Sequence, residues 1–244
     1  MIISVTKLIA LAGHNPYFQA IDAFYALRRR KYSNSSVRQI LAKHPMAKRF
    51  TSVARITPKL KQDARRIINI VCKEQKVNFG RPYGFFARHR GRVFEHKAVA
   101  KIAQVFKPND LKLQVPTQFH AHGFTIRGKA DCLIDGEVVI EIKCRMYRFM
   151  KAKSFELDQL SLYCTSLQKP GLLIQYFDEQ LHVTKLSLQE AEERTHKLLE
   201  DAEWLFGSIR RREGFPSSTL PKRPGAFERR YSSHLVQELR RQSS

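Results

Sequence analysis

The chain of 244 residues carries 44 Lys and Arg residues against 22 Asp and Glu residues, which gives a formal net charge of +22 at pH 7. A charge this large favours a polyanionic partner, with nucleic acid ahead of an acidic membrane surface. The hydrophobic content of 43% suffices for one large α/β domain or two small ones. Because no run of eighteen apolar residues occurs, the sequence predicts no membrane-spanning segment.

The positive charge is concentrated in the N-terminal part of the chain. Residues 1–94 hold twenty Lys and Arg residues against three acids, whereas the rest of the chain holds 24 against 19. We therefore expect a helical basic extension over residues 1–80, a globular core over residues 81–212, and a basic linker and tail over residues 213–244. The extension is the predicted contact surface for a polyanion.

The four cysteines show no metal-binding or redox spacing. Cys72, Cys132, Cys144 and Cys164 form no CxxC pair, which argues against zinc and against a thioredoxin-like motif. With no signal peptide visible, their free thiols indicate a reducing intracellular compartment, such as the nucleus, the cytoplasm or a virus-infected or phage-infected cell. A mitochondrial targeting segment is less favoured, because the basic N-terminal region also carries helix signals and aromatic residues suited to packing.

Helix signals dominate the N-terminal part. Helices are predicted over residues 15–30, 36–43 and 57–76. The second is expected to end near His44-Pro45, because a residue that precedes proline avoids the helical conformation. Apolar residues of the third recur at helical spacing and predict a buried face. Basic residues with few balancing acids cover much of its remaining surface, which we interpret as facing phosphates.

The rest of the chain alternates helices and strands, which predicts a mixed α/β fold. The order is a loop over residues 78–83, a helix over 89–106, strands over 113–119 and from 124, a helix over 155–167, and strands over 171–177 and 181–186. A capping box of Ser187 and Glu190 begins a long helix that runs to residue 210. A linker over residues 214–225 follows, and residues 232–241 form either a short basic helix or a disordered tail.

Two acids and a lysine gather on a hairpin in the middle of this core, between Gly128 and Cys144. Asp131 lies on the first strand, and Glu141 and Lys143 lie two residues apart on the second, so a regular strand directs both to one face. Asp131 and Glu141 can share a face only if the loop holds an odd number of residues or a bulge intervenes. We predict a three-residue loop over residues 135–137 with Gly136 in the left-handed conformation. A divalent cation would offset the cost of burying the two acids.

Four short motifs occur in an order that resembles the PD-(D/E)XK nuclease superfamily, in its RecB-like and phage lambda exonuclease-like branch. Gly91 to Glu95 resembles the GxxxE of the first core helix, and Gly128 to Asp131 resembles the GxxD that supplies the first acid. Glu141 to Lys143 resembles the ExK, and Gln159 to Tyr163 the QxxxY. The resemblance covers about residues 91–209. It implies a restriction-endonuclease-like core, in which helices flank a mixed central β-sheet.

The resemblance also implies a catalytic centre that binds Mg²⁺ or Mn²⁺. Its metal ligands would be Glu95, Asp131, Glu141 and the backbone carbonyl of Ile142, and hard oxygen ligands suit either ion. Lys143 would orient the attacking water or stabilise developing charge. The substrate-binding candidates are the two polar residues of the QxxxY motif and the nearby arginines, namely Gln159, Tyr163, Arg88, Arg90, Arg92, Arg145 and Arg148. Tyr163 is a candidate for stacking on a base.

The expected function is metal-dependent hydrolysis of phosphodiester bonds in DNA during recombination, repair or replication. The exonuclease mode rests on the family resemblance alone, so a structure-selective or sequence-selective endonuclease on the same core is an alternative. A catalytically inactive DNA-binding protein is a second alternative. RNA stays open as a substrate, because phosphate contacts do not identify the sugar. A single-strand-annealing or replication protein and a second copy of the chain are further candidate partners.

Overall fold

The computed structural model describes residues 2–12, 14, 35–53, 55–74 and 84–211. The predicted helix over residues 15–30, the loop over 78–83, the linker and the tail lie outside these residues. The helices are α1 (Val5–Leu11), α3 (Ser35–Lys43), α4 (Pro45–Ser52), α5 (Pro58–Glu74), α6 (Gly84–Phe106), α7 (Ser154–Leu167) and α8 (Leu188–Arg211). The strands are β1 (Ile2–Ser4), β2 (Leu111–Ala121), β3 (Phe124–Ile134), β4 (Val138–Cys144), β5 (Gly171–Phe177) and β6 (Gln180–Leu186).

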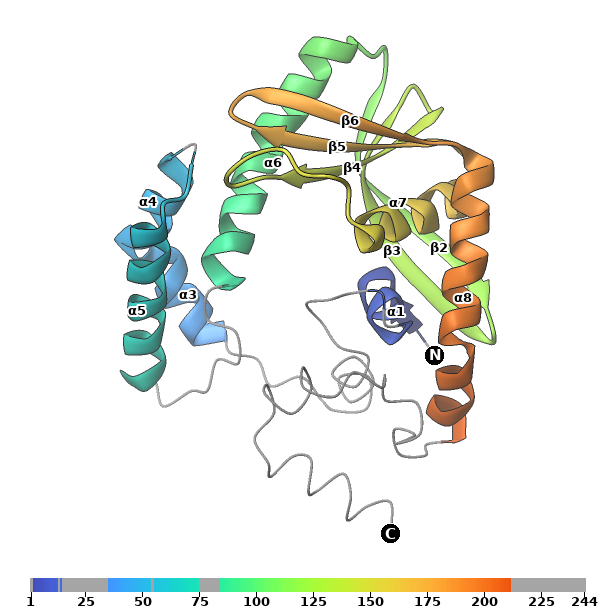
Figure 1. Cartoon of the computed structure of the whole chain (residues 1–244), viewed down its shortest axis with the longest axis horizontal. Helices are drawn as coiled ribbons and strands as arrows, with labels where there is room; N and C mark the ends of the chain where they lie inside the picture. The colour runs from blue at the N-terminus through green and yellow to red at the C-terminus, as the bar shows by residue number, and fades with distance from the viewer. Residues whose placement is uncertain (1, 13, 15–34, 54, 75–83, 212–244) are drawn as a thin grey trace.

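The six strands form one mixed sheet with helices on both faces, which confirms the predicted fold class (Figure 1). The order of the main path is β1-β3-β4-β5-β6, and β2 pairs with β3. The β1–β3 and β4–β5 pairs are parallel, and the other pairs are antiparallel. Both central strands, β4 and β5, contain consecutive buried apolar residues, as expected for strands covered on both faces.

Two apolar clusters lie on opposite faces of the sheet. On one face, α1, α7 and α8 pack against residues such as Ile126, Val139 and Leu173. On the other face, α6 packs against residues such as Ile140 and Ile174. Neighbouring residues of β4 and β5 therefore alternate between the two clusters, as the two-residue period of a strand requires.

Residues 2–11 belong to this core and not to a separate extension. Ile2 to Ser4 pair in parallel with Thr125 to Arg127 of β3, and the side chain of Ile3 is fully buried. Leu8 and Ile9 of α1 pack in the same cluster as α7 and α8. The predicted boundary at residue 80 therefore does not hold for β1 and α1.

Helices α3, α4 and α5 form a unit with its own apolar core, which lies beside the N-terminal half of α6 (Figure 1). Phe50 of α4 packs against Phe86 of α6 with their ring centroids 5.6 Å apart. Helix α4 was not predicted, because His44-Pro45 was interpreted only as a stop. Pro45 instead occupies the first turn of a new helix, and the Nδ1 atom of His44 accepts the N–H of Met46 at 3.1 Å.

The remaining elements follow the predicted order with shifted ends. Helix α6 begins at Gly84, five residues before the predicted start, and β3 is one continuous strand of eleven residues. The capping box before α8 is present: Glu190 accepts the backbone N–H of Ser187, and the Ser187 hydroxyl accepts the N–H of Glu190. Within the described part of the chain, no helix is both long and apolar enough to cross a membrane.

Candidate active site

The hairpin between β3 and β4 has the predicted three-residue loop. Ile134 pairs with Val138, so residues 135–137 form the loop, and Gly136 has a φ of 70° in the left-handed region. Continuing the register from Cys132 and Ile140 places Asp131 across from Glu141. The predicted loop is confirmed, and it brings the two acids together.

The two strands stop pairing at this position. The last pair is Cys132 with Ile140, and beyond it the carboxylate of Asp131 takes over the role of a strand carbonyl. Its Oδ2 atom accepts the backbone N–H of Ile142 at 2.7 Å. Burial raises the pKa of Asp131, while this hydrogen bond and the charge of Lys143 oppose the rise. Because the strands stop pairing here, Asp131 and Glu141 lie across from each other next to Cys132 and Ile140 of the apolar cluster that packs against α6.

Glu141 and Lys143 form a buried ion pair. Glu141 is only 3% exposed, and its Oε1 atom accepts a hydrogen bond from the Nζ atom of Lys143 at 2.5 Å. Burial raises the pKa of Glu141, against the charge of Lys143, and the charge of Asp131 adds to the rise. Burial alone would lower the pKa of Lys143, but the pairing with Glu141 outweighs it and the pKa is raised. Lys143 is therefore an ammonium ion over the physiological range.

Helix α7 holds this lysine from the other side. Gln159 accepts from the Nζ atom of Lys143 at 3.0 Å, and its Nε2 atom donates to the hydroxyl of Tyr163 at 3.0 Å. Tyr163 is 4% exposed, so its ring has no surface on which a base could stack. The predicted stacking role is wrong for this arrangement, and Tyr163 instead orients Gln159.

Gly128 of the GxxD motif explains how Tyr163 fits there. A Cβ atom at Gly128 would lie 2.5 Å from a ring carbon of Tyr163 and 2.8 Å from a methyl group of Val5. Only glycine therefore allows the tyrosine ring to pack against the backbone of β3. This motif supplies both an acid, Asp131, and the space that positions the neighbouring helix.

Glu95 approaches the same site from α6 and is held by a residue that the sequence did not indicate. The Nε2 atom of Gln114, on β2, donates to Oε1 of Glu95 at 2.9 Å. The same amide interacts with Asp131, and this contact opposes the rise in the Asp131 pKa. Burial raises the pKa of Glu95, and the charge of Asp131 adds to this effect.

The fit of this site to a divalent cation can be tested on its oxygen atoms. The second carboxylate oxygen of Glu141, Oε2, is buried and has no hydrogen-bond partner among the residues that the structure describes. Asp131, across from Glu141 in the register, adds a second carboxylate, and carboxylate oxygens are the ligands that Mg²⁺ and Mn²⁺ prefer. As the side chains stand, no three His, Cys, Asp or Glu residues in the described ranges enclose a single ion position. The donor chemistry fits the cation, and Lys143, Gln114 and the Ile142 N–H hold the acids in this arrangement.

Two of the five candidate arginines are structural. Arg90 is 2% exposed, and its guanidinium donates to the carbonyls of Phe50 and Val53 at 3.0 and 2.6 Å. It also lies 3.8 Å from the ring centroid of Phe94. The predicted phosphate contact is wrong for Arg90, because its donors cap the end of α4 and attach the helical unit to α6.

Arg145 is the second structural arginine. It forms a two-pronged ion pair with Glu156 at 2.7 and 2.8 Å, and its Nε atom donates to Gln175 at 2.6 Å. These donors are directed into the protein, so the predicted phosphate contact is wrong here too. The remaining candidates, Arg88, Arg92 and Arg148, are exposed.

Comparisons with known proteins find similar solved structures at low identity. No family model matches the sequence, and no curated protein is similar to it in sequence. Among solved structures, the chain is similar to a candidate exonuclease from Eubacterium rectale, with 15% identity, a TM-score of 0.49, and coverage of 87% of this chain and 82% of that one.

Two further solved structures are similar. The alkaline exonuclease LHK-Exo from Laribacter hongkongensis has 14% identity, a TM-score of 0.41, and coverage of 86% of this chain and 92% of that one. The protein SSO0001 has 16% identity, a TM-score of 0.42, and coverage of 68% and 85%. At identities this low, the likenesses concern the fold alone and identify neither a substrate nor a reaction.

Proposed function

We propose that the chain is a metal-dependent nuclease that hydrolyses phosphodiester bonds in DNA. The observation that carries this proposal is the placement of Asp131 and Glu141 across from each other beside the ammonium group of Lys143, at the point where β3 and β4 separate. Clustered carboxylates repel phosphate, so a protein that only binds DNA gains nothing from them. A catalytic centre that binds a cation requires them.

The chain's own groups have distinct roles in this proposal. Glu95, Asp131, Glu141 and the carbonyl of Ile142 would hold Mg²⁺ or Mn²⁺, which when bound polarises the phosphate and lowers the pKa of a water molecule. The side chain of Lys143 is a protonated ammonium group, and it donates hydrogen bonds to Glu141 and Gln159, which fix its position. It therefore donates a hydrogen bond to the attacking water or to the phosphate and does not act as the base.

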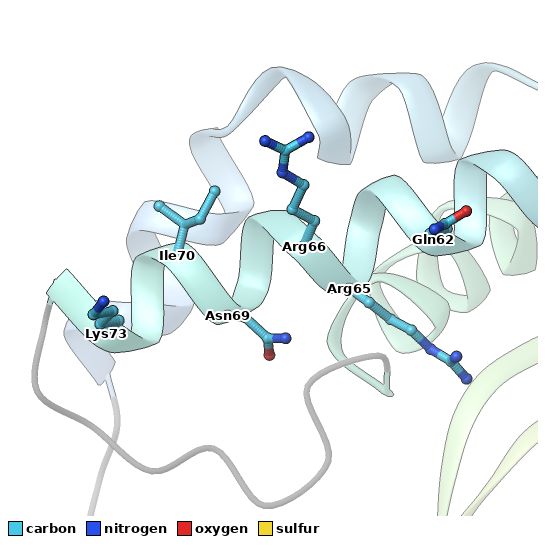
Figure 2. Close-up of a pocket in the computed structure, with 6 residues that line it drawn as sticks. All are labelled: Gln62, Arg65, Arg66, Asn69, Ile70 and Lys73. Atoms are coloured by element: carbon cyan, nitrogen blue, oxygen red, sulfur yellow. The ribbon is translucent and has the colours of Figure 1, made fainter.

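The helical unit of α3, α4 and α5 supplies the proposed contact surface for DNA. Its described residues carry ten Lys and Arg residues, but only Asp63 and Glu74 are acidic. A groove along α5 is lined by polar and basic side chains together with the exposed Ile70, and the set is Gln62, Arg65, Arg66, Asn69, Ile70 and Lys73 (Figure 2). This groove extends over eleven residue steps, about 17 Å of helix. Over that length a DNA duplex carries about ten phosphate charges.

The motif resemblance supports exonucleolytic action, in recombination, repair or replication, ahead of internal cleavage. A direct test of the nuclease proposal uses end-labelled linear DNA incubated with the protein in Mg²⁺ and, separately, in EDTA. We expect release of mononucleotides or short oligomers only with Mg²⁺. Intact DNA with every divalent cation tried would overturn the proposal.

A further inference from the structure

Gln114 has a backbone conformation that sets it apart from the other strand residues. Its φ is 53°, in the left-handed region that side chains other than glycine seldom adopt. The other non-glycine residues with positive φ in the described ranges lie at a helix end or in a turn. Strained backbone of this kind persists where the surrounding structure requires it, often at functional sites.

The strain coincides with a break in the sheet at Asp131. In the β2–β3 ladder, Leu113 pairs with Cys132 and Val115 pairs with Ala130, but the intervening pair, Gln114 with Asp131, is not made. The ladder between β3 and β4 ends at the pair of Cys132 with Ile140, so Asp131 is unpaired there as well. Asp131 is therefore released from regular pairing on both sides.

Both strands change face at this position. Ala130 and Cys132 of β3 are two residues apart, so a regular strand would bury them on one face. Instead, Ala130 packs in the cluster with α7 and α8, and Cys132 packs in the cluster with α6. The same change occurs along β2, where Leu111 contacts the α6 cluster and Val115 contacts the other.

At this crossing the amide of Gln114 meets two acids that come from different elements, α6 and β3. It donates to Glu95 of α6 at 2.9 Å and interacts with Asp131 of β3. A regular β2 strand would not present this side chain at the crossing. We infer that Gln114 is a positioning residue of the proposed nuclease, whose amide holds Glu95 toward Asp131 so that both acids serve one divalent cation.

This inference rests on the proposed function. Two variants separate the effect of the Gln114 amide from the effect of its strained backbone. Replacing Gln114 by glycine removes the amide but relieves the backbone strain, whereas replacing it by alanine removes the amide and keeps the strain. If Gln114 served only to set the backbone conformation of β2, Gln114→Gly would keep the affinity of the site for the divalent cation. If the amide positions the acids, both variants weaken the cation site equally.

The test measures Mn²⁺ binding to the full chain by electron paramagnetic resonance, together with thermal unfolding. We expect Gln114→Gly and Gln114→Ala to weaken Mn²⁺ binding by about tenfold or more, which is the usual effect of losing a group that orients a metal ligand. The glycine variant is expected to unfold at a higher temperature than the alanine variant. The Mn²⁺ concentration for half-maximal cleavage should rise by the same factor as the dissociation constant.

Gln118→Ala is the matched control, because Gln118 lies on the same strand and accepts from Arg127 at 2.7 Å, away from the acids. It should bind Mn²⁺ like the unaltered chain. Wild-type Mn²⁺ affinity in Gln114→Gly, with affinity lost in Glu141→Ala, would overturn the positioning role and leave the nuclease proposal intact. An unaltered chain that binds no Mn²⁺ would overturn both.

Discussion

Asp131 accepts the backbone N–H of Ile142 at 2.7 Å, across the gap where β3 and β4 cease to pair. The acid therefore satisfies a strand donor that would otherwise be unpaired, and it does so next to Glu141. The Oδ2 atom of Asp131 therefore has a structural role. Replacing Asp131 by asparagine should therefore keep an oxygen that accepts the Ile142 N–H, so the fold is preserved, but it removes the negative charge.

Asp131→Asn and Glu141→Gln should each lower the cleavage rate by about a thousandfold or more, because the amides cannot replace the charge of a metal ligand. DNA binding should be retained or become tighter, since a charge that repels phosphate is removed. Cleavage is measured by release of labelled nucleotide, and binding by fluorescence anisotropy in Ca²⁺. Glu137→Gln, in the exposed hairpin loop, is the control and should cleave normally. Wild-type cleavage by both amide variants would refute the assigned acids.

Tyr163→Phe separates a positioning role from base stacking. The variant keeps the ring but loses the hydroxyl that accepts from Gln159, so Gln159 holds Lys143 less firmly. We expect the cleavage rate to fall by about threefold to tenfold, with a loss of about 1 kcal/mol in the free energy of unfolding. Unchanged cleavage would show that the hydroxyl has no part in orienting Lys143.

Arg90→Met should destabilise the fold by about 2–3 kcal/mol, because the carbonyls of Phe50 and Val53 lose a charged donor in a buried place. Urea unfolding measures this loss. Arg92→Ala, on the exposed side of the same helix, should leave stability within about 0.5 kcal/mol. Equal stability of the two variants would contradict the structural assignment of Arg90.

His14 links α1 to α7 and α8, and it makes part of the stability depend on pH. Its ring nitrogens lie 3.0 Å from Asp158 and 2.8 Å from Asp201, and Arg194 contacts the second oxygen of Asp158 at 2.8 Å. The hydrogen bond to Asp158 raises the pKa of His14 above 6.5, although burial opposes it. The stabilisation is therefore complete below pH 6.5 and is lost as the pH rises through the folded-state pKa.

His14→Gln should accordingly cost about 1 kcal/mol of unfolding free energy at pH 6 and less at pH 9. His196→Gln is the control, because His196 is exposed and pairs with Glu200 on its own helix. The measurement is urea unfolding across this pH range. A cost that grows with pH would have the wrong sign for a histidine held by two carboxylates.

The groove on α5 predicts a change in the salt dependence of DNA binding. Replacing Arg66 and Lys73 by glutamine should reduce the slope of log K against log salt by about 2, because each lost phosphate contact removes about 0.9 from the slope. Lys185→Gln on β6, exposed and outside the helical unit, is the control and should leave the slope unchanged. An unaltered slope in the double variant would place the contact surface elsewhere.

Local patterns were sufficient to predict the hairpin, α7, β5 and the capping box before α8, because each depends on nearby residues. The strand β1 could not be predicted this way, since its three residues are fixed by parallel pairing with β3, more than one hundred positions away. Pro45 also illustrates a local ambiguity, because proline both ends one helix and begins the next.

The proposed catalytic acids were predicted from motif order, but the residues that hold them were not. Gln114 lies in a segment that has the pattern of an ordinary strand, and its role is visible only where the ladder breaks at Asp131. Arg90 and Arg145 were predicted to contact phosphate, because nothing in their spacing shows the buried carbonyls and the carboxylate that receive their donors. Such contacts are set by tertiary packing, which a single sequence does not reveal.

The measurement that tests the central claim most directly is a time course on linear DNA labelled at one 5′ end, beside a covalently closed circle, with Mg²⁺ and with EDTA. The unaltered chain should release mononucleotides or short oligomers from the linear DNA alone, and only with Mg²⁺, while Glu141→Ala should bind the DNA without cutting it. Cutting of the circle would identify an endonuclease on the same core. Tight binding with no cleavage under any divalent cation would contradict the nuclease proposal and identify a DNA-binding protein without nuclease activity.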